Sequence, residues 1–254
     1  MKYIEDLHKL KIFRKKNVAA LTKDENAAKE ILRRYKKQGW ISQVRRDLYV
    51  ATDLANKTSL ATKFEIASRI TPSSCLAYHA ALEYHGLAHQ VFHELYVSSK
   101  EIFNSFDYDG ITYTFCQSKL ETGVVNPVTD TLIRVTDLER TILDCINRMD
   151  LSGGLEELVQ CFAVVTFVNE NRLLDYLHYF NKQILYQKAG FVLCYFQKEM
   201  KLSDDFFETC ESKIGKSTRY LTDIQLSNTY FKEWRICAPE NILSFLEQGE
   251  NEYV

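Results

Sequence analysis

Residues 22–39 carry a helix start, an amphipathic repeat and a helix stop. Thr22 and Glu25 have the spacing of a capping box, in which each side chain accepts a hydrogen bond from the other residue's backbone amide. Gly39 suits the left-handed backbone that often follows a helix. The sequence therefore predicts a helix from Thr22 to about Gln38.

This helix has one apolar and one polar side. At 100° per residue four apolar residues share a face, namely Ala28, Ile31, Leu32 and Tyr35. The opposite face carries Asn26, Lys29, Glu30, Arg33 and Lys37, with Lys23 and Arg34 on its flank. We expect the apolar side to be buried and the polar side to face solvent.

The neighbouring segments complete a recognisable layout. Apolar residues at helical spacing predict a first helix at residues 3–10, and a short second helix follows at residues 18–21. Residues 40–44 and 48–50 are typical of two strands joined by a turn at residues 45–47. Three helices followed by a hairpin indicate a winged helix-turn-helix.

The rest of the chain mixes both element types. The patterns predict helices at 60–69, 75–84 and 138–148, strands at 95–97 and 111–115, and successive helices to about 215. We therefore predict an α+β protein. Its winged helix-turn-helix domain covers residues 1–55, with a short polar hinge at 51–59, and a larger, mixed, helix-rich α/β domain covers residues 56–254.

Charge is divided unevenly between these two parts. The net charge of the chain is −2. Residues 1–50 contain 14 Lys and Arg against six Asp and Glu, a net charge of +8, so the remainder carries −10. A basic module on an acidic body is the pattern that attraction to a polyanion requires, although a solvated surface would also account for charge alone.

Combined with the winged-helix layout, this charge predicts binding to double-stranded DNA. The third helix would enter the major groove, where Asn26 suits adenine and Arg33 suits guanine. Phosphate contacts are predicted for Lys15, Lys16, Lys29, Lys37, Arg45 and Arg46, and Lys23 and Arg34 complete the predicted DNA-binding set. The alternative is a winged helix that docks other proteins.

Several short blocks resemble the AbiEi-type family of antitoxins and transcriptional regulators. They are Tyr78–Leu87, Val135–Asp144, Gly153–Glu157, Ala189–Leu193 and Tyr230–Ile236, and Thr-Asp-Leu-Glu-Arg-Thr within the second is the most distinctive. The resemblance implies an amino-terminal winged helix that represses its own operon. It also implies a carboxy-terminal domain that counters a nucleotidyltransferase-like toxin, usually the product of the adjacent gene, without stable binding to it.

One departure from the family concerns the hairpin. The family's Arg-Gly-x-Tyr is here Arg46-Asp47-Leu48-Tyr49. Aspartate tolerates the left-handed backbone of a tight turn, so we expect the hairpin to form with an added negative charge at its tip.

Metal and enzyme sites are less well supported by the sequence. His79, His85, His89 and His93 lack a ligand pattern such as His-Glu-x-x-His, and Gly86 interrupts the helix between them. Asp107-Tyr108-Asp109 precedes Gly110 and indicates a turn rather than a nucleotidyltransferase metal site.

A nuclease would need acidic residues that hold a divalent metal. Glu199-Met200-Lys201 and Glu211-Ser212-Lys213 have a suitable local sequence, but both lie in predicted helices. Asp137, Glu139 and Arg140 could form a catalytic cluster, although capping of the helix at 138–148 explains them more simply.

We therefore predict a non-enzymatic repressor and antitoxin with no metal or cofactor. Two copies on an inverted repeat of a promoter are the expected DNA complex, and the toxin is the expected functional partner. A solitary regulator, a protein-interaction adaptor and a metal-dependent nuclease are the alternatives. Seven scattered cysteines, no spanning apolar segment and no signal-peptide core predict a reduced protein in the cytoplasm.

Overall fold

The computed structural model describes residues 2–117, 122–222 and 229–248. The chain divides into two compact units. The first contains residues 1–75, 93–119 and 126–134, and the second contains the remainder. Helices and strands occur in both, which confirms the α+β class. The division differs from the predicted single boundary at residue 55.

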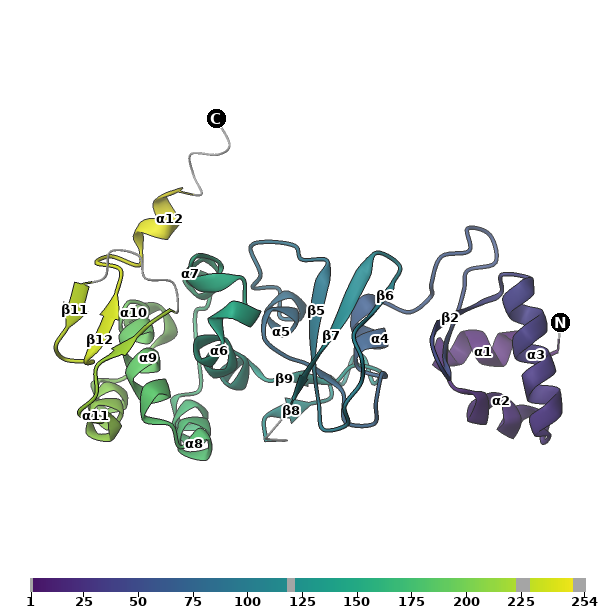
Figure 1. Ribbon diagram of the computed structural model, residues 1–254, viewed down its shortest axis with the longest axis horizontal. Coiled ribbons are helices and arrows are strands. Elements are labelled where there is room, and N and C mark those ends of the chain that lie inside the picture. Colours follow the sequence, from purple (N-terminus) through teal and green to yellow (C-terminus); the bar gives the residue numbers. More distant parts are fainter. Residues whose placement is uncertain (1, 118–121, 223–228, 249–254) are drawn as a thin grey trace. The chain divides into compact units, whose positions relative to one another are not determined.

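The amino-terminal part of the first unit packs three helices beside a small antiparallel sheet (Figure 1). Its elements are α1 (Ile4–Leu10), β1 (Ile12–Phe13), α2 (Lys15–Thr22), α3 (Glu25–Lys37), β2 (Ile41–Arg45) and β3 (Leu48–Ala51). The strand order is β1-β3-β2. The predicted hairpin is present, and β1 adds a strand that the sequence pattern does not predict.

The start of α3 differs from the predicted capping box. Thr22 still belongs to α2, where its hydroxyl donates to the carbonyl oxygen of Val18 at 3.0 Å. Asp24 caps α3 instead, because its Oδ1 accepts from the backbone amide of Asn26 at 2.8 Å. The helix therefore begins three residues later than predicted.

The apolar side of α3 is buried as predicted. Ala28, Ile31, Leu32 and Tyr35 join one hydrophobic cluster. The other buried members are Ile4, Leu7, Phe13, Val18, Ile41 and Ala51. All three helices and all three strands therefore contribute residues to one small core. This core fixes the orientation of α3 about its own axis.

The rest of the first unit contains α4 (Lys63–Ala67) and the strands β5 (Glu94–Ser99), β6 (Phe106–Tyr108) and β7 (Ile111–Gln117). Strand β7 lies between β5, to which it is parallel, and β6, to which it is antiparallel. Asp109 and Gly110 both have positive φ, which is the geometry of a tight hairpin turn. This confirms the predicted turn at Asp109-Gly110.

Three basic side chains connect the amino-terminal part to the rest of its unit. Lys11 Nζ lies 2.8 Å from Glu65 Oε1. Arg14 Nη2 donates to the carbonyl oxygens of Arg69 and Ile70, each at 2.9 Å. The guanidinium of Arg45 lies over the ring of Phe106 at 5.1 Å. These long-range contacts explain why the unit extends past residue 55.

The second unit is helix-rich. Its helices are α5 (His79–Tyr84), α6 (Leu138–Asn147), the 3₁₀ turn Met149–Leu151, α7 (Gly154–Ala163), α8 (Glu170–Phe180), α9 (Gln183–Cys194), α10 (Gln197–Met200), α11 (Asp204–Lys213) and α12 (Ser244–Gln248). Its strands include β8 (Val124–Val125), β9 (Val135–Thr136), β10 (Arg219–Tyr220), β11 (Thr229–Phe231) and β12 (Ile236–Ala238).

The predicted helix at 75–84 is partly wrong. Its first two residues form strand β4 (Cys75–Leu76), and Leu76 pairs in parallel with Val135 of β9. The helix α5 begins only at His79. A strand partner 59 positions away leaves no local pattern in the sequence. The helix predicted at 138–148 depends on local signals and is confirmed as α6.

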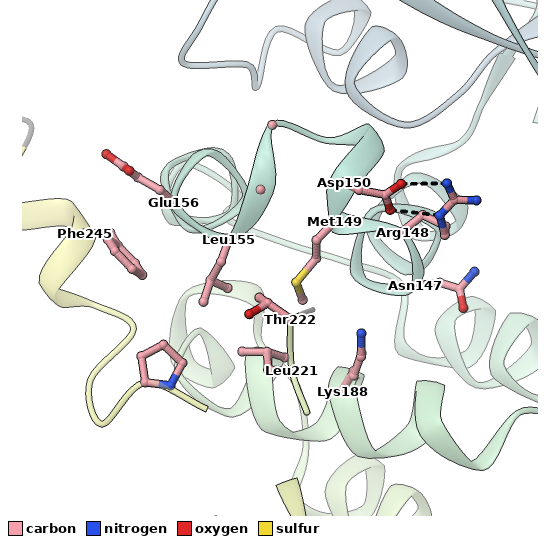
Figure 2. A pocket seen from close by; sticks show the side chains of 13 residues that line it. Asn147, Arg148, Met149, Asp150, Leu155, Glu156, Lys188, Leu221, Thr222 and Phe245 are labelled. Carbon is pink, nitrogen blue, oxygen red and sulfur yellow. Dashed lines mark hydrogen bonds and ion pairs between the residues drawn. The ribbon is translucent and has the colours of Figure 1, made fainter. Parts of the chain in front are cut away.

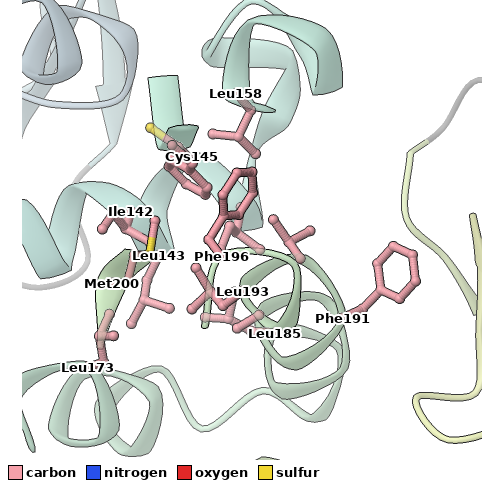
Figure 3. Packing of buried hydrophobic residues seen from close by; sticks show 14 of the residues in the cluster. Ile142, Leu143, Cys145, Leu158, Leu173, Leu185, Phe191, Leu193, Phe196 and Met200 are labelled. Atoms are coloured by element: carbon pink, nitrogen blue, oxygen red, sulfur yellow. The ribbon is translucent and has the colours of Figure 1, made fainter. Parts of the chain in front are cut away.

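The core of the second unit lies among α6, α7, α8 and α9. Figure 3 shows Leu143 of α6, Leu158 of α7, Leu173 of α8 and Leu193 of α9 within this cluster. Gly190 on α9 is required by close packing, because a side chain there would collide with the ring of Trp234. This contact explains the glycine in the Ala189–Leu193 block.

All seven cysteines lie within the described ranges, and none of them is joined in a disulfide. Burial raises the pKa of the Cys145 thiol well above its usual value and the pKa of Cys210 to about 12, so both behave as small apolar side chains. Among the described residues, no helix has the length and the apolar character that crossing a bilayer requires.

Candidate nucleic-acid interface

The polar side of α3 is exposed because its opposite side is held in the core. Asp24 and Glu25 lie at its amino-terminal end, where negative charge complements the helix dipole. The exposed residues of the predicted DNA-binding set are Lys16, Lys23, Asn26, Lys29, Arg33, Arg34, Lys37 and Arg46, while Lys15 and Arg45 are half-buried. Six residues of this set therefore lie on α3 or just before it, and all six are exposed to solvent.

Basic side chains gather around a shallow depression of about 240 Å³ between α2, α3 and the hairpin. Lys15 comes from α2, and Lys29, Arg33 and Lys36 come from α3. Its other lining residues are Leu32, Gln43 and Tyr49, so four cations and no carboxylate line it. This basic depression therefore brings cations from α2 and α3 together on one surface.

Lys36 and Gln43 line the basic depression but are absent from the predicted set. Lys36 Nζ donates to Gln43 Oε1 of β2 at 2.7 Å, which connects α3 to the hairpin. Lys36 lies seven positions after Lys29, so a helical projection places both on nearly the same line of α3. Gln43 could be found only once the hairpin is placed against α3.

Two surface ion pairs border the basic depression. Lys15 Nζ lies 2.8 Å from Glu25 Oε2, and Arg33 makes two hydrogen bonds to Glu30 at 2.8 and 3.0 Å. The hydrogen bond from Lys15 lowers the pKa of Glu25, and that from Arg33 lowers the pKa of Glu30. Exposed pairs of this kind are weak, so a phosphate could exchange for either carboxylate.

The hairpin tip is held against the start of α2. Asp47 adopts the left-handed backbone at φ 57°, as the sequence predicts. Its Oδ1 accepts from the backbone amide of Lys15 at 2.9 Å, and its carbonyl oxygen accepts from Arg14 Nη1 at 3.2 Å. The added negative charge at the tip therefore satisfies a helix amide, while the neighbouring Arg46 remains exposed.

Arg45 is engaged in packing. Its guanidinium lies 5.4 Å from the ring centre of Phe103 and 5.1 Å from that of Phe106. Burial lowers the pKa of Arg45, with a further contribution from Arg14. A register irregularity between Gln43 and Arg45 accompanies this arrangement. The guanidinium of Arg45 is therefore less accessible to a phosphate than that of the exposed Arg46.

Two histidine rings of the second unit, those of His79 and His85, contribute to its packing. His79 is buried, and its Nε2 lies 3.1 Å from Glu157 Oε1. Glu157 also accepts from the backbone amides of His89 and Gln90 at 2.9 and 3.0 Å. His85 Nε2 lies 2.8 Å from the carbonyl oxygen of Thr136. Within the described ranges, no group of three or more His, Cys, Asp and Glu residues is placed to hold a metal ion.

The Thr-Asp-Leu-Glu-Arg-Thr block forms a buried polar network. Asp137 caps α6 through the amide of Arg140 at 2.9 Å and accepts from the Tyr176 hydroxyl at 2.6 Å. Arg140 Nε lies 2.9 Å from Asp144 Oδ2. Glu139 accepts from the amide of Asn169 at 2.7 Å. Each of these side chains already has an internal partner, which favours the capping interpretation over a catalytic cluster.

Burial shifts the pKa of one carboxyl of this network. It raises the pKa of Asp144 to about 6, and the nearby Arg140 opposes the rise. Gly123 is required beside the network, because a side chain there would come within 2.9 Å of both Arg140 and Tyr176. The network therefore holds α6, α8 and the segment around Gly123 together.

The two Glu-x-Lys triplets do not form one site on a strand. Glu199 lies in α10 and Glu211 lies in α11, which confirms the prediction that both are helical. Partial burial and then the neighbouring Glu233 raise the pKa of Glu211. Asp107 of the Asp-x-Asp sequence accepts from the Thr112 hydroxyl at 2.6 Å across the β6–β7 hairpin.

Comparison with known proteins gives a fold and no family. No protein-family model matches the chain, and no curated protein matches it either. Among solved structures, the crystal structure of the RV2827C protein from Mycobacterium tuberculosis is similar, with a TM-score of 0.68 and 12% sequence identity. The match covers 98% of this chain and 94% of that one, so the two proteins share a fold along nearly their whole lengths.

Two adjacent glutamates allow a matched test of the second unit. We expect Glu157→Ala to lower the free energy of unfolding by about 1–3 kcal/mol, because it leaves the buried His79 and the backbone amides of His89 and Gln90 without their acceptor. Glu156→Ala, at the exposed neighbouring position, should change it by less than about 0.5 kcal/mol. Urea unfolding followed by circular dichroism measures both.

The same carboxylate predicts a pH dependence. Burial tends to raise the pKa of Glu157, but hydrogen bonds from His79 and the two amides bring it below the ordinary 4.5. Its stabilisation is therefore complete above about pH 4.5 and declines as the pH falls toward the folded value. An equal loss of stability in both variants, or the same acid dependence in Glu157→Ala as in the parent chain, would contradict this role.

Proposed function

We propose that the chain is a transcriptional repressor whose first fifty residues form a winged helix-turn-helix that binds double-stranded DNA. The basic depression is the observation that supports this proposal, since it joins α2, α3 and the hairpin in one positive surface. The order of three helices and a three-stranded antiparallel sheet agrees with this class of domain.

In the proposed complex α3 enters the major groove. Asn26 and Arg33 are the exposed residues suited to base edges, because an amide can pair with adenine and a guanidinium with guanine. Lys15, Lys29 and Lys36 around the basic depression would contact phosphates. Further phosphate contacts are proposed for Lys16, Lys23, Arg34, Lys37 and Arg46.

Binding would be strongly dependent on salt. Each phosphate neutralised by a lysine or arginine releases condensed counterions, so affinity falls as salt concentration rises. Two copies on an inverted repeat would double the number of contacts, and we propose this arrangement for the operator. The reduced cytoplasm, where DNA is accessible and thiols stay free, is the proposed location.

The resemblance to AbiEi-type regulators supports a second role for the same chain. The blocks that carry it lie in the buried networks around Glu157 and Asp137 and at the contact of Gly190 with Trp234. They therefore define a scaffold rather than an exposed reactive site. We propose that the second unit acts as an antitoxin against a nucleotidyltransferase-like toxin and that the chain represses the operon of both.

The DNA-binding proposal predicts graded effects of single lysines. Lys29→Ala and Lys36→Ala should each reduce the slope of log K against log salt by about 1, because each removes one phosphate contact. Lys9→Ala, at an exposed position of α1 away from the basic depression, is the matched control and should leave the slope unchanged. Fluorescence anisotropy on the DNA upstream of the coding sequence measures all three.

A charge reversal separates the proposal from the adaptor alternative. Arg33→Glu combined with Lys37→Glu should abolish promoter binding while the chain remains folded by circular dichroism. Unchanged promoter binding in that variant would contradict the assignment of α3 and favour a protein-docking module.

The antitoxin role is tested in cells. Co-expression should restore growth to cells that express the nucleotidyltransferase-like product of the neighbouring gene, and the Arg33→Glu, Lys37→Glu variant should still restore it, because the second unit is intact. If no such gene adjoins this one, or if growth is not restored, the chain is a solitary regulator.

A further inference from the structure

A cavity of the first unit, separate from the basic depression, is lined by three basic residues, namely Arg14, Lys16 and Arg69. Among the described residues that line it there is no Asp or Glu. Arg14 and Lys16 lie at the start of α2, and Arg69 follows α4, so we name it the α2–α4 cavity. Its volume of about 350 Å³ is within the range of about 300–1,000 Å³ that is typical of small-molecule sites.

The balance of charge distinguishes the α2–α4 cavity from a larger cavity of the second unit, which is shown in Figure 2. There Arg148 makes two hydrogen bonds to Asp150, at 2.8 and 2.6 Å. These hydrogen bonds are the main cause of the lowered pKa of Asp150, and the charge of Lys188 contributes to it. A carboxylate of the same cavity therefore interacts with both of its basic side chains.

The guanidinium of Arg14 is held in place by neutral partners. Its Nη2 donates to the carbonyl oxygens of Arg69 and Ile70, each at 2.9 Å. Its Nη1 donates to the carbonyl oxygen of Asp47 at 3.2 Å. Burial is the main cause of the lowered pKa of Arg45, and the positive charge of Arg14 adds to it. Arg14 is therefore fixed by its hydrogen bonds while its charge still acts on its surroundings.

The other two basic residues of the cavity have few partners. Lys16 is exposed, and Arg69 is half-buried with one hydrogen bond, from Nη2 to the carbonyl oxygen of Thr131 at 2.8 Å. The buried Nε of Arg69 has no hydrogen-bond partner among the described residues, which is rare for a buried donor. Within the described ranges, neither side chain pairs with a carboxylate. Both charges are therefore left for a ligand.

The first turn of α2 adds further features that favour an anion. Asn17 Oδ1 accepts from the backbone amide of Arg14 at 2.8 Å, which leaves the side-chain NH₂ group of Asn17 to donate. This turn contains no acidic residue, although Asp47 Oδ1 accepts from the amide of Lys15 at 2.9 Å. The positive end of the α2 dipole therefore adds to the charge of Lys16.

We propose that the α2–α4 cavity binds the phosphate group of a small phosphorylated molecule, with Lys16 and Arg69 as charged contacts and Asn17 as a neutral one. A phosphate has several acceptor oxygens, and an ammonium and a guanidinium both donate charge-assisted hydrogen bonds to it. The bound phosphate would reduce the mutual repulsion of the basic residues and would link the start of α2 to the segment after α4. The site does not depend on the proposed DNA binding, although Lys16 belongs to both sets of contacts.

The test measures binding of phenyl phosphate to the full chain by isothermal titration calorimetry at constant ionic strength. Arg69→Gln keeps a donor and removes the charge, so it should weaken binding at least about tenfold. Lys16→Gln, at an exposed position, should have the same effect and serves if Arg69→Gln unfolds on thermal melting. Arg219→Gln, at an exposed position of β10, is the matched control and should bind as the parent chain does. Phenol, which lacks the phosphate, should not compete.

The DNA backbone is the other source of the same phosphate chemistry. With a small molecule as the ligand, Arg69→Gln should leave the dependence of DNA affinity on salt unchanged. If the cavity holds a backbone phosphate instead, Arg69→Gln should reduce the slope of log K against log salt by about 1, and the parent chain should not bind phenyl phosphate. That result would overturn the proposal.

Two further outcomes would also overturn it. One is equal affinity for phenyl phosphate in the parent chain, Arg69→Gln and Lys16→Gln. The other is weaker binding in Lys29→Gln and unchanged binding in Arg69→Gln, since the anion would then occupy the basic depression. The calorimetry uses no DNA, so failure of this site and failure of the DNA-binding proposal are separate outcomes.

Discussion

Burial of one side of α3 determines what the other side can do. Ile31, Leu32 and Tyr35 are held in a core with Leu7 and Phe13, and each such side chain contributes about 1.5–3 kcal/mol by leaving water. A helix fixed in this way cannot rotate about its axis without exposing that surface. Lys29, Arg33 and Lys36 are consequently kept at the basic depression, whether or not an anion is present.

The hairpin depends on the same core and adds its own restraint. Ile41 is buried with α3, and Asp47 ties the tip to the amide of Lys15. Exposed ion pairs such as Arg33 with Glu30 contribute little to stability. Lys11 and Arg14 have structural partners within the first unit, whereas Lys29 and Lys37 are exposed, and for exposed basic residues of this kind we propose DNA as the ligand.

Local signals in the sequence were sufficient for α3, the β2–β3 hairpin, the turn at Asp109-Gly110 and α6. They were insufficient where a distant residue decides the local structure. Leu76 lies in a strand because it pairs with Val135. Arg45 packs on Phe103 and Phe106, which lie about sixty residues further along the chain. The predicted cap of α3 is wrong for a local reason. Thr22 completes α2, and Asp24 caps α3 instead.

The same distinction applies to the functional residues. The exposed positions of α3 follow from helical periodicity, and Lys36 could have been included on that basis. The contact of Gln43 with Lys36 and the network around Glu157 combine residues from several elements, so only the fold reveals them.

The most direct test of the central claim is the affinity of the full chain for the duplex upstream of its own coding sequence, measured against a scrambled duplex of equal length over a series of salt concentrations. Recognition of an operator through α3 predicts tighter binding to the upstream duplex and an affinity for both duplexes that falls linearly on a log–log plot as salt increases. Failure to bind either duplex at low salt, or equal affinity for the two at every salt concentration, would contradict it.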